Sequence, residues 1–114
     1  MLMSSELHTA VSAGIPAIWI VLNDARYGLV ADGMGGLGYA NDGLSFAPAD
    51  LALHARSMGA LGLSVSTECQ LASTLLRALN AGVPCVVDVL MDPEEKAPVG
   101  ARNASLADQG GDGR

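Results

Sequence analysis

Apolar side chains recur three and four positions apart in three segments of this 114-residue chain. That spacing predicts amphipathic helices over residues 4–13, 48–58 and 68–81. Gly14 and Gly82 come directly after the first and third of these segments, where glycine commonly ends a helix. Ser66 or Thr67 is expected to cap the third helix through its hydroxyl group.

Three short apolar runs alternate with these helices and predict strands over residues 17–22, 63–65 and 83–91. Ala17–Leu22 is apolar at every position, so this strand is expected to be buried on both faces. Alternating helices and strands indicate parallel pairing through right-handed crossovers. The predicted fold is therefore α/β, a Rossmann-like parallel sheet flanked by helices. Because the pattern begins with a helix, the sheet is expected to lack its first strand.

Two segments have no periodic pattern. Residues 25–47 hold six glycines and are expected to form a functional loop, since glycine-rich stretches of this length are often irregular. From Glu94 onward the apolar periodicity stops, and the residues are rich in Ala, Asp and Gly. We therefore expect one domain over residues 1–93 and a disordered tail over residues 94–114.

The composition limits the kinds of partner that the chain could bind and the compartment in which it is expected. The net charge is −6 with only six Lys and Arg residues, which argues against nucleic acid and anionic membranes as partners. No apolar run approaches the roughly 20 residues that span a bilayer, and the N-terminus has no signal-peptide pattern, so a cytoplasmic protein is expected. Cys69 and Cys85 have no CxxC spacing and are both expected to be small buried hydrophobes.

The first predicted strand ends in two adjacent polar residues, Asn23 and Asp24. In open parallel sheets, ligands bind just beyond the carboxyl ends of the strands. The side-chain oxygens of this pair suit Mg²⁺ or Ca²⁺ better than a soft metal. An Asn-Asp pair is also a common turn former, and the dipeptide alone favours a turn.

Longer motifs in the sequence are more specific than the Asn23-Asp24 pair alone. The motifs in the first part of the chain are Glu6-Leu-His-Thr-Ala-Val11, Gly14-Ile-Pro16, Ile20-Val-Leu-Asn-Asp24 and Tyr27-Gly28. Those in the later part are Phe46-Ala-Pro-Ala-Asp50-Leu-Ala52, Met58-Gly-Ala60, Val83-Pro-Cys-Val-Val-Asp-Val89 and Asp92-Pro-Glu94. Together they resemble the C-terminal pyrophosphate-binding domain of thiamine-diphosphate-dependent enzymes. The likeness is closest to the branch with acetolactate synthase and benzoylformate decarboxylase.

The resemblance implies a cofactor site after the first strand. In the family, a divalent metal bridges the diphosphate to protein oxygens, and Mg²⁺ readily shares its shell with phosphate. The matching metal ligands here would be the side chain of Asp24 and the backbone carbonyl of Arg26. Asn23 would hold the turn by hydrogen bonds, and Tyr27 and Gly28 would shape the wall beside the diphosphate. Simple packing explains Tyr27 equally well.

The resemblance also implies missing parts. The family motif begins with Gly-Asp-Gly, whose aspartate is a third metal ligand, and this triplet should lie just upstream of Met1. The Gly-Asp-Gly at Gly111–Gly113 is read as a coincidence of the tail. The family's active site also needs a pyrimidine-binding domain on a partner subunit, with a glutamate that activates the cofactor. We therefore expect a fragment or split subunit that forms a homo- or hetero-oligomer, acts on a 2-keto acid and is unlikely to be active alone.

Two other interpretations stay open. The chain could be a non-catalytic α/β oligomerisation module derived from such an enzyme, with a vestigial metal site. An unrelated Rossmann-like nucleotide binder is weaker, because no GxGxxG follows a strand. His8 and His54 are expected on helices, in packing and in a solvated face respectively, and no catalytic residue is assigned.

Overall fold

The computed structural model describes residues 3–40 and 42–95, and the chain divides into two compact units. The first, here called the sheet unit, comprises Met1–Asn23 and Ala49–Met91. The second, here called the α2 unit, comprises Asp24–Pro48 and the described residues from Asp92. Of the expected tail, residues 96–114, including Gly111–Gly113, lie outside the described residues. The amides of its first two residues, Glu94 and Glu95, donate hydrogen bonds to Asp92.

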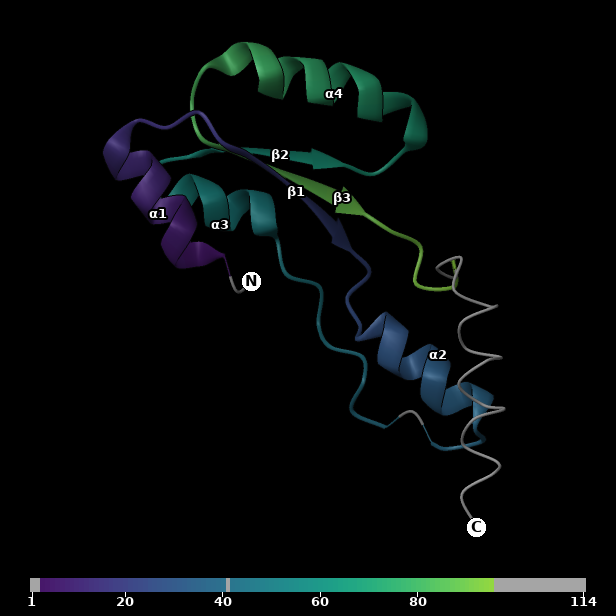
Figure 1. Cartoon of the computed structure of the whole chain (residues 1–114). Helices are drawn as coiled ribbons and strands as arrows, with labels where there is room; N and C mark the ends of the chain where they lie inside the picture. The colour runs from purple at the N-terminus through teal and green to yellow at the C-terminus, as the bar shows by residue number, and fades with distance from the viewer. Residues whose placement is uncertain (1–2, 41, 96–114) are drawn as a thin grey trace, which may run out of the picture. The chain divides into compact units, whose positions relative to one another are not determined.

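The sheet unit contains three parallel strands, β1 (Ile18–Asn23), β2 (Leu61–Val65) and β3 (Cys85–Leu90), in the order β1-β3-β2. Val87 of the central strand is level with Ile20 on one side and Leu63 on the other. Helix α4 (Glu68–Ala81) lies on one face, and α1 (Ser4–Ala13) and α3 (Leu51–Ser57) lie on the other (Figure 1). The α/β prediction is confirmed, although three strands are fewer than a full Rossmann sheet has.

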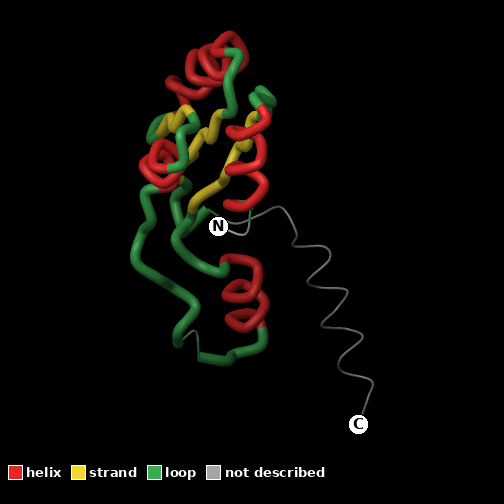
Figure 2. Tube along the Cα trace, turned by 90° about the vertical axis from the view of Figure 1, so that its left-hand side faces the viewer, coloured by secondary structure: helices red, strands yellow, loops and turns green. Residues whose placement is uncertain are grey.

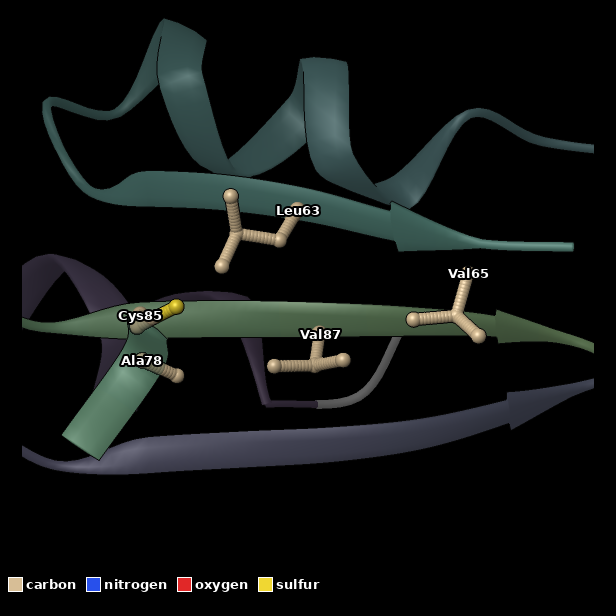
Figure 3. Close-up of a cluster of buried hydrophobic side chains, with 5 residues drawn as sticks. All are labelled: Leu63, Val65, Ala78, Cys85 and Val87. Atoms are coloured by element: carbon tan, nitrogen blue, oxygen red, sulfur yellow. The ribbon is translucent and has the colours of Figure 1, made fainter. Parts of the chain in front are cut away.

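Side chains of β3 alternate between the two faces, as a strand requires. Cys85 and Val87 of β3 form a buried cluster with Leu63 and Val65 of β2 and Ala78 of α4 (Figure 3). On the opposite face, Val86 packs with three other buried residues, Leu7, Ala55 and Ala60. Both clusters are centred on β3, so the middle strand is the centre of the core.

Strand β1 is not buried on both faces, and this expectation is wrong. Trp19 and Val21 pack against the cluster under α1 and α3. On the opposite face Ile20 is 55% exposed and Leu22 is 66% exposed. The reason is the strand order: β1 is an edge strand, and α4 packs on β2 and β3.

Helix α3 approaches β2 unusually closely. A Cβ atom on Gly62 would overlap the backbone carbonyl of Ala52 in α3. Asp50 caps the start of this helix, because its Oδ1 accepts a hydrogen bond from the Leu53 amide at 2.7 Å. The predicted second helix is confirmed by these contacts, with a start three residues later than expected.

The ends of the other helices largely follow the prediction. Gly14 and Gly82 end α1 and α4 in the left-handed region, with φ of 66° and 65°. Thr67 occupies the N-cap position of α4 but its side chain makes no capping bond, and its hydroxyl lies 3.3 Å from Cys69 Sγ. Cys69 is exposed, so the expectation that it is buried is wrong, whereas Cys85 is buried as expected.

The α2 unit contains a helix where an irregular loop was expected. Helix α2 (Gly28–Gly36) includes four glycines, which individually disfavour a helix. Figure 2 shows this helix between two loop stretches. Of its residues only Ala31 is buried. After the helix, Gly38 and Gly43 both adopt φ of 77°, which is typical of glycine in turns.

Candidate functional site

In the sheet unit, the end of β1 is tied to β3 by the side chain of Asn23. Its Nδ2 donates to Asp88 Oδ1 and to the carbonyl of Ala49, both at 3.1 Å. Its backbone carbonyl accepts from the amide of Met91 at 2.8 Å. The side-chain amide of Asn23 therefore bonds to two residues that are far away in the sequence, Ala49 and Asp88, and does not simply stabilise its own turn.

Asp88 is the polar centre of this unit. It is only 1% exposed, and its Oδ2 accepts a hydrogen bond from the amide of Leu51, the first residue of α3, at 3.1 Å. The N-terminus of a helix favours a negative charge, and a buried carboxylate must have hydrogen-bond donors around it. This role of Asp88 was not predicted, although a single aspartate in the apolar run 83–91 was the available signal in the sequence.

In the α2 unit, the residues directly after β1 form a turn around Asp24. Its Oδ1 accepts from the amide of Arg26 at 3.3 Å, and Ala25 between them has φ of 53°. A non-glycine residue with positive φ is uncommon and is held by its surroundings. The turn favoured by the Asn-Asp pair is therefore present, and the side chain of Asp24 stabilises it.

The guanidinium of Arg26 lies between two carboxylates. Its Nε is 3.7 Å from Asp24 Oδ2, and its Nη2 is 3.6 Å from Asp32 Oδ1. The Arg26 side chain is only 18% exposed, and its buried Nε has no hydrogen-bond partner among the described residues. The positive charge of Arg26 thus balances Asp24, while one buried donor is left without an acceptor. No pattern in the sequence predicts this pairing.

The backbone carbonyl oxygens of residues 25–27 differ in whether they accept a hydrogen bond. The carbonyl of Ala25 accepts from the Phe46 amide at 3.0 Å, and that of Tyr27 accepts from the Ala31 amide at 2.9 Å. The carbonyl of Arg26 accepts no hydrogen bond within the described part of the chain. A backbone oxygen without a donor therefore lies two residues after the Asp24 carboxylate.

Gly28 and Tyr27 complete this segment. A Cβ atom on Gly28 would lie 2.6 Å from Asp24 Oδ2, so the carboxylate occupies the space that a larger residue would need. Tyr27 is 61% exposed, and its ring contacts Phe46 edge-on with centroids 5.3 Å apart. Packing thus explains one edge of Tyr27, and most of its ring is accessible. Of the predicted residues, Asp24, Arg26, Tyr27 and Gly28 lie together in the α2 unit.

The described residues set limits on this site. Within residues 3–40 and 42–95, no three His, Cys, Asp or Glu side chains gather as a metal cluster would. None of the helices in the same residues has the length and apolar character needed to cross a bilayer. The chain is a parallel α/β protein, and in that class ligands bind just beyond the carboxyl ends of the strands, the position that Asp24 occupies after β1.

Comparison with known proteins identifies the family within this class. Residues 1–89 match the family described as thiamine pyrophosphate enzyme, C-terminal TPP binding domain. The chain belongs to this family. The resemblance inferred from the motifs at Asn23–Asp24 and Tyr27–Gly28 is therefore confirmed.

Two relatives place the chain more narrowly. It is 37% identical over 98 residues to "Putative acetolactate synthase large subunit IlvB2" of Mycobacterium tuberculosis, covering 86% of this chain and 18% of that protein. It is 37% identical over 87 residues to "Acetolactate synthase" of Bacillus subtilis, covering 76% of this chain and 15% of that protein. The chain is thus a C-terminal thiamine-pyrophosphate-binding domain similar to those of acetolactate synthases, and it spans less than a fifth of either relative.

Proposed function

We propose that this chain supplies the Mg²⁺- and diphosphate-binding half of an acetolactate-synthase-like decarboxylase or carboligase that acts on 2-keto acids. The observation that carries the proposal is the turn at residues 24–26, in which the Arg26 amide donates to the Asp24 carboxylate while the Arg26 carbonyl accepts no hydrogen bond among the described residues. These are the two positions that correspond to metal ligands in the family motif. Bound thiamine diphosphate would supply the electron sink for decarboxylation.

The donor set suits a hard divalent cation. Mg²⁺ prefers oxygen ligands and commonly uses one or two carboxylates together with water and phosphate oxygens. Asp24 Oδ2 makes only a 3.7 Å ion pair and no hydrogen bond among the described residues, so it is available to a cation. Two protein oxygens are enough for such a shared shell, and a third from a Gly-Asp-Gly aspartate would complete the family pattern.

Arg26 fits a site that holds anionic oxygens as well as a metal. Its buried Nε lacks an acceptor among the described residues, and an unpaired buried donor is unfavourable. A phosphate oxygen that reaches the accessible part of the guanidinium would form a charge-assisted hydrogen bond with it. Asp24 adds a negative charge beside the diphosphate, and the cation together with Arg26 would offset it.

Catalysis would need a partner. None of the residues near Asp24 is assigned a proton-transfer role, and the resemblance implies a pyrimidine-binding domain with an activating glutamate on another subunit. We propose that the chain works within such a homo- or hetero-oligomer and is inactive alone. A cytoplasmic location stays a prediction.

A non-catalytic oligomerisation module is the second candidate. The exposed side chains of Ile20 and Leu22 on the edge strand favour it, because exposed apolar strand edges tend to pair with other chains. Under this alternative, Asp24 would hold only the local turn. Loss of Asp24 would then change turn stability without changing any cofactor binding.

Calorimetry with thiamine diphosphate separates the two candidates. The full chain is titrated with and without Mg²⁺, as wild type, as Asp24→Ala and as Asp42→Ala, an exposed carboxylate of the same unit. The proposal predicts Mg²⁺-dependent binding that Asp24→Ala weakens at least about tenfold, or roughly 1.4 kcal/mol, and that Asp42→Ala leaves unchanged. Equal loss in both variants, or no binding by wild type even with a pyrimidine-domain partner, would contradict it.

A further inference from the structure

A second candidate site lies in the sheet unit, along the outer edge of β2. A pocket of about 420 Å³ is bounded there by α3, β2 and α4. Its polar lining comes from all three elements: Arg56 from α3, Ser64 from β2, and Thr74 and Arg77 from α4. Neither the family motif nor the predicted cofactor residues include any of these positions.

The charge of this pocket is one-sided. Arg56 and Arg77 are the only lysine or arginine residues in the sheet unit, and both line the pocket. Among the residues that the structure describes, no carboxylate lines it. Neither arginine forms an ion pair within the described residues, although the whole chain is acidic. Two like charges that share a pocket repel each other, and a bound anion would relieve this repulsion.

The position of Arg56 is fixed by the strand edge. Its Nη1 donates to the carbonyl of Gly62 at 3.2 Å. Arginine has five N–H donors, and the other four of Arg56 have no hydrogen-bond acceptor in the part of the chain that the structure describes. Gly62 itself is held by close packing on Ala52. One bond to a rigid strand therefore orients the guanidinium and leaves most of its donors for a ligand.

Helix α4 supplies the second charge and a hydroxyl group. Thr74 and Arg77 are three residues apart and so share a face of the helix. Burial raises the pKa of the Cys85 thiol on β3, and the charge of Arg77 opposes this rise. The hydroxyl groups of Ser64 and Thr74 have no hydrogen-bond partner among the described residues. The pocket thus presents two guanidinium groups and two unpaired hydroxyls.

We propose that this pocket binds a small oxyanion, a phosphate or carboxylate group, between Arg56 and Arg77. Planar guanidinium groups recognise both kinds of group through paired charge-assisted hydrogen bonds. Ser64 and Thr74 would donate their hydroxyl protons to the remaining oxygens. The ligand lies in the sheet unit and is bound independently of the cofactor proposed above.

Nuclear magnetic resonance titrations of the full chain test this site. Inorganic phosphate and acetate are added separately at constant ionic strength, with sodium chloride as the matched control. The expected result is saturable shifts of the Ser64, Thr74 and Arg77 signals, with the stronger binder naming the class of anion. Shifts that never saturate, that sodium chloride reproduces, or that saturate only at other residues would overturn the proposal.

Variants assign the binding to the two arginines. Arg56→Gln and Arg77→Gln are each expected to weaken binding at least about tenfold. Arg77→Lys keeps the charge without the planar fork and should weaken binding less, which keeps the test valid if a glutamine variant fails to fold. Ser73→Ala removes an exposed hydroxyl of α4 that bonds to the Gln70 carbonyl, and it should leave the affinity unchanged. An equal effect of Ser73→Ala and Arg77→Gln would contradict the assignment.

Discussion

The sheet unit and the α2 unit are stabilised in different ways. In the sheet unit, apolar clusters lie on both faces of β3, and the same strand carries one buried carboxylate, Asp88, that accepts hydrogen bonds from Asn23 and Leu51. In the α2 unit, the helix buries only Ala31, and the local structure depends on ion pairs and turn hydrogen bonds. The candidate metal ligands lie in the second unit, where few apolar contacts restrict the backbone. Sites that bind ligands are often in such regions of low local stability.

Among the changes that test this difference between the two units, Gly62→Ala is expected to have the largest effect on the free energy of unfolding. The new methyl group would overlap the carbonyl of Ala52, a backbone atom that cannot move without displacing α3. We expect the free energy of unfolding to fall by about 3 kcal/mol or more, because overpacking against backbone is poorly relieved. Urea unfolding followed by circular dichroism measures the change. A loss below about 1 kcal/mol would show that α3 and β2 are not held together this closely.

Asp88→Ala should have the next largest effect. It removes an acceptor of the Asn23 side chain and the acceptor of the Leu51 amide, so the amide at the start of α3 loses its partner. We expect a loss of about 2–4 kcal/mol in the free energy of unfolding. Asp88→Asn keeps the shape and one acceptor oxygen and should lose less. Equal free energies of unfolding for Asp88→Ala and wild type in urea would show that the hydrogen bonds of Asp88 do not stabilise the sheet unit.

The pH dependence of stability tests the burial of Cys85. Burial raises the pKa of this thiol, although Arg77 opposes the shift, so the folded state holds the proton more tightly than the unfolded state. Its contribution to stability is complete below the unfolded pKa of about 8.5 and is lost as the pH rises above it. The slope should be at most about 1.4 kcal/mol per pH unit and should be absent in Cys85→Ala. Unfolding at pH 7 to 10 measures it, and the same slope in both proteins would contradict the prediction.

The smallest expected effect is a gain in the α2 unit. A Cβ atom on Gly33 meets no atom within 4 Å, so Gly33→Ala adds no clash. Alanine should stabilise α2 by about 0.5–1 kcal/mol because glycine is the poorer helix former. Amide hydrogen exchange of residues 31–36 should slow by a few fold, while exchange in β3 stays unchanged. Faster exchange in α2 would show that Gly33 has a structural need for glycine.

The two units also differ in how much of their structure the sequence could predict. The bounds of α1 and the glycines that end α1 and α4 follow from local spacing and conformation, and both predictions are confirmed. Helix α2 was not predicted because four of its nine residues are glycine, and one of its contacts is the ion pair of Asp32 with Arg26. The pattern of residues 25–47 contains no signal for such a contact.

Predictions about burial needed information that the sequence does not contain locally. The exposure of Ile20 and Leu22 depends on the strand order, which places β1 at an edge. The role of Asp88 depends on partners 37 and 65 positions away in the chain. The candidate site could be predicted from the sequence because Asp24, Arg26, Tyr27 and Gly28 lie close together along the chain. Family resemblance could therefore predict them as a site, whereas the pairing of Arg26 with Asp32 required the fold.

The location of the metal is the most direct test of the account. Mn²⁺ can replace Mg²⁺ at oxygen sites, and its unpaired electrons broaden nuclear magnetic resonance signals of nearby amides. With thiamine diphosphate and a small amount of Mn²⁺, the account predicts broadening of the amides of residues 24–28 in the wild type and its loss in Asp24→Ala. Broadening confined to other carboxylates, such as Asp42 or Asp92, or unchanged broadening in Asp24→Ala, would contradict it.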